Sequence, residues 1–191
     1  IVKDFQYNTH DFFFTSRIKK IHYLGGRFLG SYINSLLLFL FIPLAIIIGN
    51  MTLSPELQGP INWQTFAYPF FWIVIPNVFI ISSFIFSLSA SKRQSIYTYM
   101  SSIVLIMLYL MLILGTGHMK NSNLRILIDP FGQNAINIAS QYWTVSDMNY
   151  RFMPVTQMLI LNRLLWVSFS ALLLCLTFKK FKMFHDLPSK K

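Results

Sequence analysis

Residue types that could carry out acid–base or nucleophilic chemistry are few in this chain and far apart. The sequence holds six carboxylates, and none forms a close pair for general acid and base work. They are Asp4, Asp11, Glu56, Asp129, Asp147 and Asp186. The metallopeptidase, nucleotide-binding and serine-hydrolase signatures H-E-x-x-H, G-x-x-x-x-G-K-[ST] and G-x-S-x-G are absent. The sequence therefore predicts no catalytic residue.

Metal-binding residues are equally sparse. The single cysteine, Cys175, lies in an apolar stretch, and no Cys and His residues show a metal-binding spacing. His22 and His118 are far apart in the chain and too few to form a site. We therefore predict no metal and no cofactor. Cys175 is expected to be a packing or lipid-facing residue, and the two histidines are expected to be polar residues at a membrane interface.

One charged residue stands inside an otherwise uncharged apolar stretch. From residue 152 to residue 178 the only charged side chain is Arg163, and Asn162 precedes it. If a helix begins near Pro154, Arg163 lies about nine residues along it, or about 13 Å at 1.5 Å per residue. One interpretation is that its side chain extends outward to the headgroups. The other is that Asn162 and Arg163 face a bundle interior and line a translocation path or a subunit contact.

Long uncharged stretches determine the predicted fold class. No charged residue occurs at 28–55, 57–91 or 94–119, and each stretch exceeds the roughly 20 residues that a helix needs to cross a ~30 Å hydrocarbon core. Hydrophobic residues make up 54% of the chain and charged residues 12%, whereas soluble domains carry about 25% charge. The sequence therefore predicts an all-α, polytopic membrane helix bundle that forms one transmembrane domain, and it argues against a soluble protein.

Four membrane spans are predicted, at 33–49, 66–88, 96–114 and 154–178. Pro43 predicts a local kink in the first span, where neighbouring groups must satisfy the freed carbonyl. Aromatic residues crowd the beginning of the second span, as in an interfacial belt. Pro154 suits the first turn of the fourth span.

The distribution of Lys and Arg predicts the orientation of these spans. An even number of spans places both chain ends on one side, and cytoplasmic loops carry the excess of basic residues. Twelve Lys and Arg residues lie before the first span, between the second and third, and after the fourth, against three in the two opposite loops. Both ends, including the basic tail 179–191, are therefore predicted to be cytoplasmic. The net charge of +10 then reflects orientation in the membrane and not nucleic-acid binding.

The segment 118–153, between the third and fourth spans, is too long for a simple turn. Asp129 followed by Pro130 is a favourable helix start, with Asp at the N-cap and Pro at the first helical position. Ile136, Ile138 and Ala139 then give a short helix an apolar side. We predict a helical outer loop that lies at the outer membrane interface or dips into it.

The segment 1–31, before the first span, combines aromatic and basic residues. Thr9 or Asp11 could cap a short amphipathic helix that contains Phe12 and Phe13. Gly25 and the glycine after it are expected to break the helical pattern before the first span. One interpretation is an interfacial segment held by anionic lipid headgroups. The other is a cytoplasmic helix to which a partner protein docks.

Two stretches of the sequence resemble a known family. The segment 127–174 resembles the outer loop and last span of bacterial ABC-2-type transporter permeases, and 15–40 resembles their cytoplasmic loop and following span. Some of the similar permeases carry an aminopeptidase-like extension. The residues that carry the resemblance are Tyr23, Gly26, Arg27, Phe28, Gly30, Asp129, Pro130, Phe131, Gly132, Tyr142, Trp143, Asn149, Asn162, Arg163 and Trp166.

The resemblance implies a function, a location and partners. Such permeases reside in the bacterial inner membrane, have six spans, pair with a second permease half and bind ABC ATPase subunits that hydrolyse ATP. On that basis the chain is a fragment that begins after the second span, and its coupling helix corresponds to residues near 9–17. These coupling residues are Thr9, His10, Asp11, Phe12, Phe13, Thr15, Ser16 and Arg17. The sequence departs from the family in lacking two spans, and it carries no ATPase or zinc-peptidase motif.

Three functions are open on the sequence. The first is the membrane-spanning permease subunit of an ATP-driven ABC transporter, which is itself not an enzyme. The second is a non-transporting assembly or interaction protein of the membrane, whose outer loop 118–153 recruits a partner. The third is a membrane-embedded enzyme, for which the sequence offers neither a nucleophile with a base nor a metal site.

Overall fold

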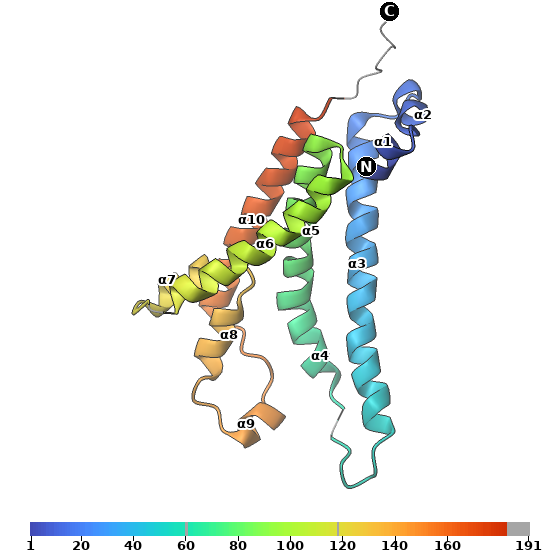
Figure 1. Cartoon of the computed structure of the whole chain (residues 1–191). Helices are drawn as coiled ribbons and strands as arrows, with labels where there is room; N and C mark the ends of the chain where they lie inside the picture. The colour runs from blue at the N-terminus through green and yellow to red at the C-terminus, as the bar shows by residue number, and fades with distance from the viewer. Residues whose placement is uncertain (60, 118, 183–191) are drawn as a thin grey trace, which may run out of the picture.

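The computed structural model describes residues 1–59, 61–117 and 119–182, which are helical and contain no strand (Figure 1). His118, Asp186 and the part of the basic tail from 183 to 191 lie outside the described residues. Four helices are long and apolar enough to cross a membrane, which confirms the predicted fold class. They are α3 (Lys20–Met51), the continuous helix Trp63–Lys92, α6 (Ser95–Thr116) and α10 (Gln157–Lys180).

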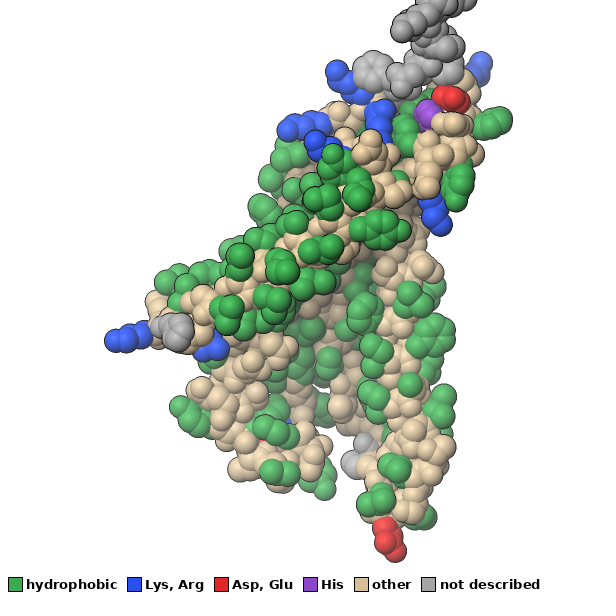
Figure 2. All heavy atoms as spheres, in the orientation of Figure 1, with side chains coloured by type: hydrophobic (Ala, Val, Ile, Leu, Met, Phe, Trp, Pro, Cys, Tyr) green, Lys and Arg blue, Asp and Glu red, His purple; other side chains and the backbone are tan. Residues whose placement is uncertain are grey.

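Five short helices accompany the four long ones. They are α1 (Val2–Gln6), α2 (His10–Thr15), α7 (Ser122–Ile128), α8 (Gln133–Ser140) and α9 (Val145–Tyr150). Helices α1 and α2 lie at the end where α3 begins, α5 connects to α6 and α10 terminates (Figure 1). We call this the basic end, because Figure 2 shows Lys and Arg side chains gathered over it. Helix α9 and the α3–α4 loop lie at the opposite end.

The second long helix contains a widened turn. It consists of α4 (Trp63–Pro69), the π-helical segment η1 (Phe70–Val74) and α5 (Ile75–Lys92). Pro76 has no N–H and its ring would clash with the carbonyl four residues earlier, so a regular α-helical turn is disfavoured here. Instead the N–H of Ile75 donates to the carbonyl of Phe70, five residues earlier. The helix therefore passes the proline without ending, and it extends beyond the predicted span 66–88 on both sides.

Helix α5 is at the centre of the bundle, where it packs against α3, α6 and α10. Small side chains are buried along its length, among them Ser83, Ser87 and Ala90, and α10 buries Ser170 and Thr177. Such residues let helix backbones approach closely in a membrane bundle. Between α3 and α5 the contact is aromatic, since the ring of Phe28 meets Phe79 and Phe86 edge-on.

Helices α3 and α6 leave most of their apolar surface uncovered. Helix α6 buries only Ser101 and Thr116, and α3 buries residues only in its first turns. Figure 1 shows α6 crossing the bundle obliquely, and Figure 2 shows hydrophobic side chains along both α3 and α6. An apolar cavity of about 330 Å³ lies between α3 and the α4–η1 segment. Water solvates such a surface poorly, whereas lipid tails accommodate it.

Two helix starts differ from the prediction. Helix α3 begins at Lys20 and runs through Gly25 and Gly26, which were expected to break it. Each glycine costs about 1 kcal/mol in a helix, and the buried side chains of Tyr23 and Leu24 beside them offset this cost. Helix α10 begins at Gln157 and not at Pro154.

The start of α10 is set by a threonine. The hydroxyl of Thr156 accepts a hydrogen bond from the N–H of Leu159 at 3.2 Å, which is the geometry of an N-cap. Pro154 therefore lies in the extended segment before the helix, and Arg163 is only about six residues, or about 9 Å, from the helix start.

Candidate functional site

The N-terminal segment folds onto the basic end through the buried carboxylate of Asp4. Its Oδ2 accepts a hydrogen bond from the hydroxyl of Tyr23 at 2.8 Å, and its Oδ1 accepts one from Nη2 of Arg27 at 2.6 Å. The Asp4 side chain is almost completely enclosed, and these two hydrogen bonds satisfy both of its oxygens. Loss of Arg27 would remove the closest cation from a buried carboxylate, which is costly. The three residues, called the Asp4 cluster below, fix α1 to the first turns of α3.

An aromatic layer completes this contact. The rings of Phe5 and His10 stack with centroids 4.6 Å apart, and Phe13 and Phe14 lie 5.5 and 5.8 Å from the ring of Tyr23. Burial of such rings and their edge-to-face contacts stabilise the docked position of α2. The inner face of α2 is therefore used for folding and is not available to a partner.

The predicted coupling residues divide into an inner and an outer set. The structure places a short helix here, α2, but the Thr9 hydroxyl donates to the carbonyl of Asp4 and does not cap the helix. Phe12 points outward with 79% of its surface exposed. Thr9, Phe12, Thr15, Ser16 and Arg17 are exposed, whereas His10, Asp11 and Phe13 are partly buried. That these residues bind a partner stays a prediction.

Basic side chains connect α1 and α3 to the ends of the other long helices. The guanidinium of Arg93, which follows α5, lies over the rings of Phe5 and Phe181 at 4.7 and 5.1 Å. Nζ of Lys20 donates to the carbonyls of Lys179 and Phe181 at 3.1 and 2.8 Å. The two Lys20 contacts join residues that are 159 and 161 positions apart in the chain, so no local sequence pattern predicts them.

The second polar cluster lies within the membrane-length part of the bundle. Asn162 is 0% exposed and Arg163 is 4% exposed, so the interpretation that Arg163 extends outward is wrong. Arg163 donates from Nη1 to Oδ1 of Asn77 on α5 at 2.7 Å. It also donates from Nε to Oδ1 of Asn162 at 2.9 Å and from Nη2 to the carbonyl of Pro130 at 3.2 Å. These groups, with Asp129 and Trp166, are called the Arg163 network below.

Carbonyl groups at the end of α7 explain why α10 presents polar side chains here. The last carbonyls of a helix have no partner within the helix. Nδ2 of Asn162 donates to the carbonyls of Ile126 and Asp129 at 2.6 and 2.8 Å, and Nε1 of Trp166 donates to Leu127 at 3.0 Å. A guanidinium beside the same end complements the negative end of the helix dipole. The Arg163 network therefore attaches the outer loop to α5 and α10.

Asp129 does not begin a helix, contrary to the prediction. It follows the end of α7, and α8 begins four residues later at Gln133. The Asp129 carboxylate still acts as a cap, because it accepts hydrogen bonds from the N–H groups of Phe131 at 2.9 Å and Asn134 at 2.7 Å. The carboxylate can accept from both N–H groups because the chain turns at Gly132, which adopts a left-handed conformation with φ of 73°. The capping chemistry was recognisable in the sequence, but the turn between cap and helix was not.

The remaining part of the outer loop is helical, as predicted, although its position relative to a membrane interface stays a prediction. Ala135 of α8 is buried against Ile126 and Leu159. Helix α9 begins with a reciprocal cap between Thr144 and Asp147. The hydrogen bonds from the Thr144 N–H and hydroxyl hold the pKa of Asp147 below its usual value.

In both clusters the polar side chains hold helices and loops in position, and their geometry does not suit a catalytic reaction. Their polar groups are bonded to one another and to backbone groups, and Asn162 and Arg163 face the outer loop. Their role in a translocation path or subunit contact stays a prediction. Within the described ranges no group of three or more His, Cys, Asp or Glu residues could hold a metal ion, and Cys175 is exposed. No family model, no curated protein and no solved structure matches the chain.

Proposed function

We propose that the chain is a membrane-spanning subunit of an ATP-driven ABC transporter in a bacterial inner membrane. A separate ABC ATPase subunit would hydrolyse ATP and dock on α2, and a second permease half would complete the path. One observation carries the proposal. Helix α2 is a short helix at the end of the bundle where α3 begins and α5 and α10 terminate, and the side chains of Phe12 on it and of Arg17 just after it are exposed.

The contacts at the basic end support a coupling role for α2. A displacement of α2 would act on α3 through the rings of Phe13 and Phe14, which pack against Tyr23. It would act on the end of α10 through Phe181, whose ring lies 6.4 Å from that of Tyr23. Helix α1 packs against α2 through the rings of Phe5 and His10, so the movement would also reach the start of α6, where the hydroxyl of Ser95 donates to Oε1 of Gln6 at 3.2 Å. A docking helix with links to several spans can convert a movement of the ATPase into a rearrangement of those spans.

The charge distribution supports a cytoplasmic position for the basic end. It carries ten described Lys and Arg residues, and its acids are the buried Asp4 and the half-buried Asp11. The basic residues are Lys3, Arg17, Lys19, Lys20, Arg27, Lys92, Arg93, Lys179, Lys180 and Lys182. Cytoplasmic loops carry such an excess in membrane proteins. The ATPase partner would then lie on the same side as α2.

Co-purification with an ATPase subunit tests the proposal. The full-length protein is expected to bring down an ABC ATPase, and Phe12→Ala or Arg17→Ala is expected to reduce its stimulation of ATP hydrolysis about tenfold, the usual loss for an exposed anchor at an interface. Because Phe12 is exposed, the thermal stability of the permease should not change.

Tyr142→Ala is the matched control, since Tyr142 is an aromatic residue with 87% of its surface exposed at the other end of the molecule. It should leave the ATPase stimulation intact. The proposal fails if no ATPase subunit co-purifies, or if Phe12→Ala and Arg17→Ala behave like the control.

A surface on the outer loop favours the second candidate, a membrane assembly protein without transport. Tyr142, Val145, Met148 and Tyr150 lie on α9 or just before it, and all are highly exposed. Aromatic residues and Met in an exposed group are typical of protein contacts. If this function is correct, Tyr150→Ser abolishes capture of a membrane or periplasmic partner, and ATP has no effect on the complex.

A further inference from the structure

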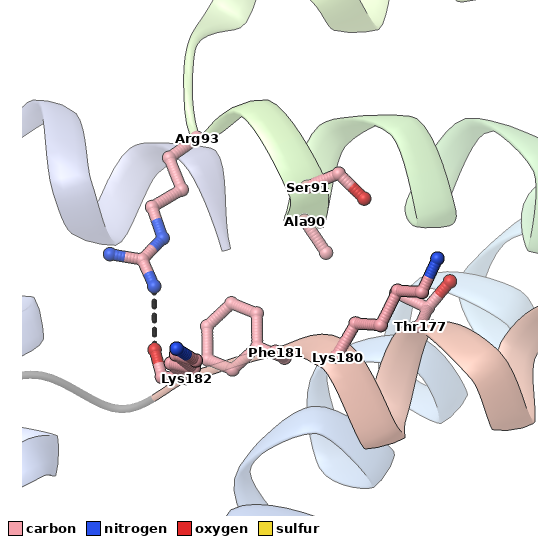
Figure 3. A pocket seen from close by; sticks show the side chains of 7 residues that line it. All are labelled: Ala90, Ser91, Arg93, Thr177, Lys180, Phe181 and Lys182. Carbon is pink, nitrogen blue, oxygen red and sulfur yellow. Dashed lines mark hydrogen bonds between the residues drawn. The ribbon is translucent and has the colours of Figure 1, made fainter.

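A pocket of about 340 Å³ opens beside the C-terminal ends of α5 and α10 at the basic end. Arg93, Lys180 and Lys182 contribute basic side chains, Ser91 and Thr177 contribute hydroxyls, and Phe181 contributes an apolar wall. Figure 3 shows the side chains of Ser91, Lys180 and Thr177 on one side of the pocket and those of Arg93 and Phe181 on the other. Among the described residues that line the pocket, three are cations and none is an acid, which favours an anionic ligand.

Helix dipoles oppose an anion at this place, because α5 and α10 both direct the carbonyls of their last turns towards it. Two cations satisfy carbonyls at and just after the end of α10, and one of them, Arg93, also lines the pocket. Lys20 donates to the carbonyls of Lys179 and Phe181, and Arg93 donates from Nη2 to the carbonyl of Lys182. The ammonium of Lys180 makes no hydrogen bond or ion pair within the described part of the chain, so its charge is available to a ligand.

Arg93 has a strained backbone conformation, and its side chain is fixed by several contacts. Arg93 has φ of 56°, a left-handed conformation in which glycine is the usual residue after a helix. A non-glycine residue here costs on the order of 1 kcal/mol. Its guanidinium is fixed over Phe5 and Phe181, with one of its five N–H groups on the Lys182 carbonyl. Within the described part of the chain, its other N–H groups make no hydrogen bond.

We propose that this pocket binds the phosphate of an anionic phospholipid headgroup. A phosphate oxygen accepts hydrogen bonds from guanidinium and ammonium groups in this arrangement. The position at the ends of two membrane-length helices is where headgroups meet a spanning protein, and basic pockets between such helices bind acidic lipids. This site is independent of any ATPase partner.

Lipid retention by the purified full chain tests the site. The protein is reconstituted in phosphatidylcholine mixed with phosphatidylglycerol, extracted into detergent and examined by native mass spectrometry for bound lipid. We expect phosphatidylglycerol to be retained in preference to phosphatidylcholine, and Lys180→Gln to lower its retention about fivefold. Equal thermal stability of the variant excludes a folding defect.

Lys179→Gln is the matched control, because Lys179 is the neighbouring exposed lysine and does not line the pocket. It removes the same charge and should retain the lipid. Three outcomes would overturn the proposal: no preference for phosphatidylglycerol, equal losses in the two variants, or full displacement of the lipid by inorganic phosphate. The second would indicate a diffuse surface charge, and the third a site for a soluble phosphate.

Discussion

Gly132 is the residue on which the closest approach in the Arg163 network depends. Its φ is 73°, and it lies against the Arg163 guanidinium. A Cβ atom at this position would lie 2.5 Å from Nη2 and 2.9 Å from Cζ of Arg163. The guanidinium could move away only by breaking its hydrogen bonds to Pro130, Asn77 and Asn162. The glycine is therefore required by both the backbone and the neighbouring side chain.

Replacement of this glycine gives the first prediction. Gly132→Ala should destabilise the protein by about 1–3 kcal/mol, because it combines a strained backbone with a displaced buried arginine. Gly115→Ala in α6 is the control, since a Cβ there meets no atom within 4 Å. Thermal unfolding in detergent should show a lower Tm for Gly132→Ala only. Equal Tm values for the two variants would contradict the geometry described for this turn.

Both the charge of Arg163 and the planar shape of its guanidinium matter for the network, because the guanidinium donates to several acceptors at once. Arg163→Lys keeps the charge, but one ammonium cannot reach Asn77, Asn162 and Pro130 together. We expect a loss of about 1.5–3 kcal/mol, the value of a hydrogen bond to a charged group, and faster proteolysis of the outer loop.

The exposed Arg151 provides the control for this second prediction. It pairs with Asp147 at 2.8 Å on the surface, where an ion pair contributes little. Arg151→Lys should therefore leave the rate of loop cleavage unchanged. If the outer loop of Arg163→Lys is cleaved no faster than that of Arg151→Lys, the Arg163 network does not hold the loop.

At the scale of elements, the N-terminal helices depend on a buried carboxylate and on an aromatic layer. Helices α1 and α2 are only five and six residues long, and helices of this length are not stable alone. Tertiary contacts must therefore hold them, and the Asp4 cluster and the aromatic layer provide these contacts.

Asp4→Asn gives the third prediction. The amide can still accept from Tyr23, but the ion pair with Arg27 is lost, so α1 and α2 should open more often. Hydrogen exchange of their amides is expected to become roughly tenfold faster, which corresponds to a loss of about 1.4 kcal/mol. Asp11→Asn serves as the comparison, since Asp11 is half-exposed and its pairing with His10 is long at 3.4 Å. Unchanged exchange in Asp4→Asn would show that the aromatic layer alone is sufficient.

At the scale of the whole molecule, charge and apolar surface are arranged along one axis. Lys and Arg gather at the basic end, and the apolar faces of α3 and α6 extend from it towards the opposite end (Figure 2). A membrane protein with the basic end in the cytoplasm accounts for both features. The long uncovered faces of α3 and α6 then contact lipid and, on our proposal, a second permease half.

Labelling of single cysteines gives the fourth prediction. Cys175 is the only cysteine of the chain, so Cys175→Ser yields a background for new cysteines at exposed positions. In intact cells a membrane-impermeant maleimide should react at Gln58→Cys and Tyr142→Cys, which lie at the opposite end. It should react at Gln94→Cys, at the basic end, only after the membrane is opened. Reaction of all three positions in intact cells would rule out the proposed orientation.

The number and the class of the long helices followed from the sequence, because hydropathy is a local property and the thickness of a bilayer sets the length of a spanning helix directly. The windows at 28–55, 57–91, 94–119 and 152–178 each contain most of one long helix. Boundaries were predicted less well where a local signal competed with packing. Gly25 and Gly26 predicted a break in the helix, but the burial of Tyr23 and Leu24 stabilises α3 across both glycines.

The tertiary structure alone decided which way polar side chains face. Whether Arg163 extends to the headgroups or turns inward depends on acceptors, and these come from Asn77 and Pro130, 86 and 33 positions away in the chain. The same holds for the basic pocket, whose residues come from the ends of two helices nearly 90 positions apart. A buried hydrogen bond needs both of its partners at close distance, and only the folded chain determines which distant groups meet.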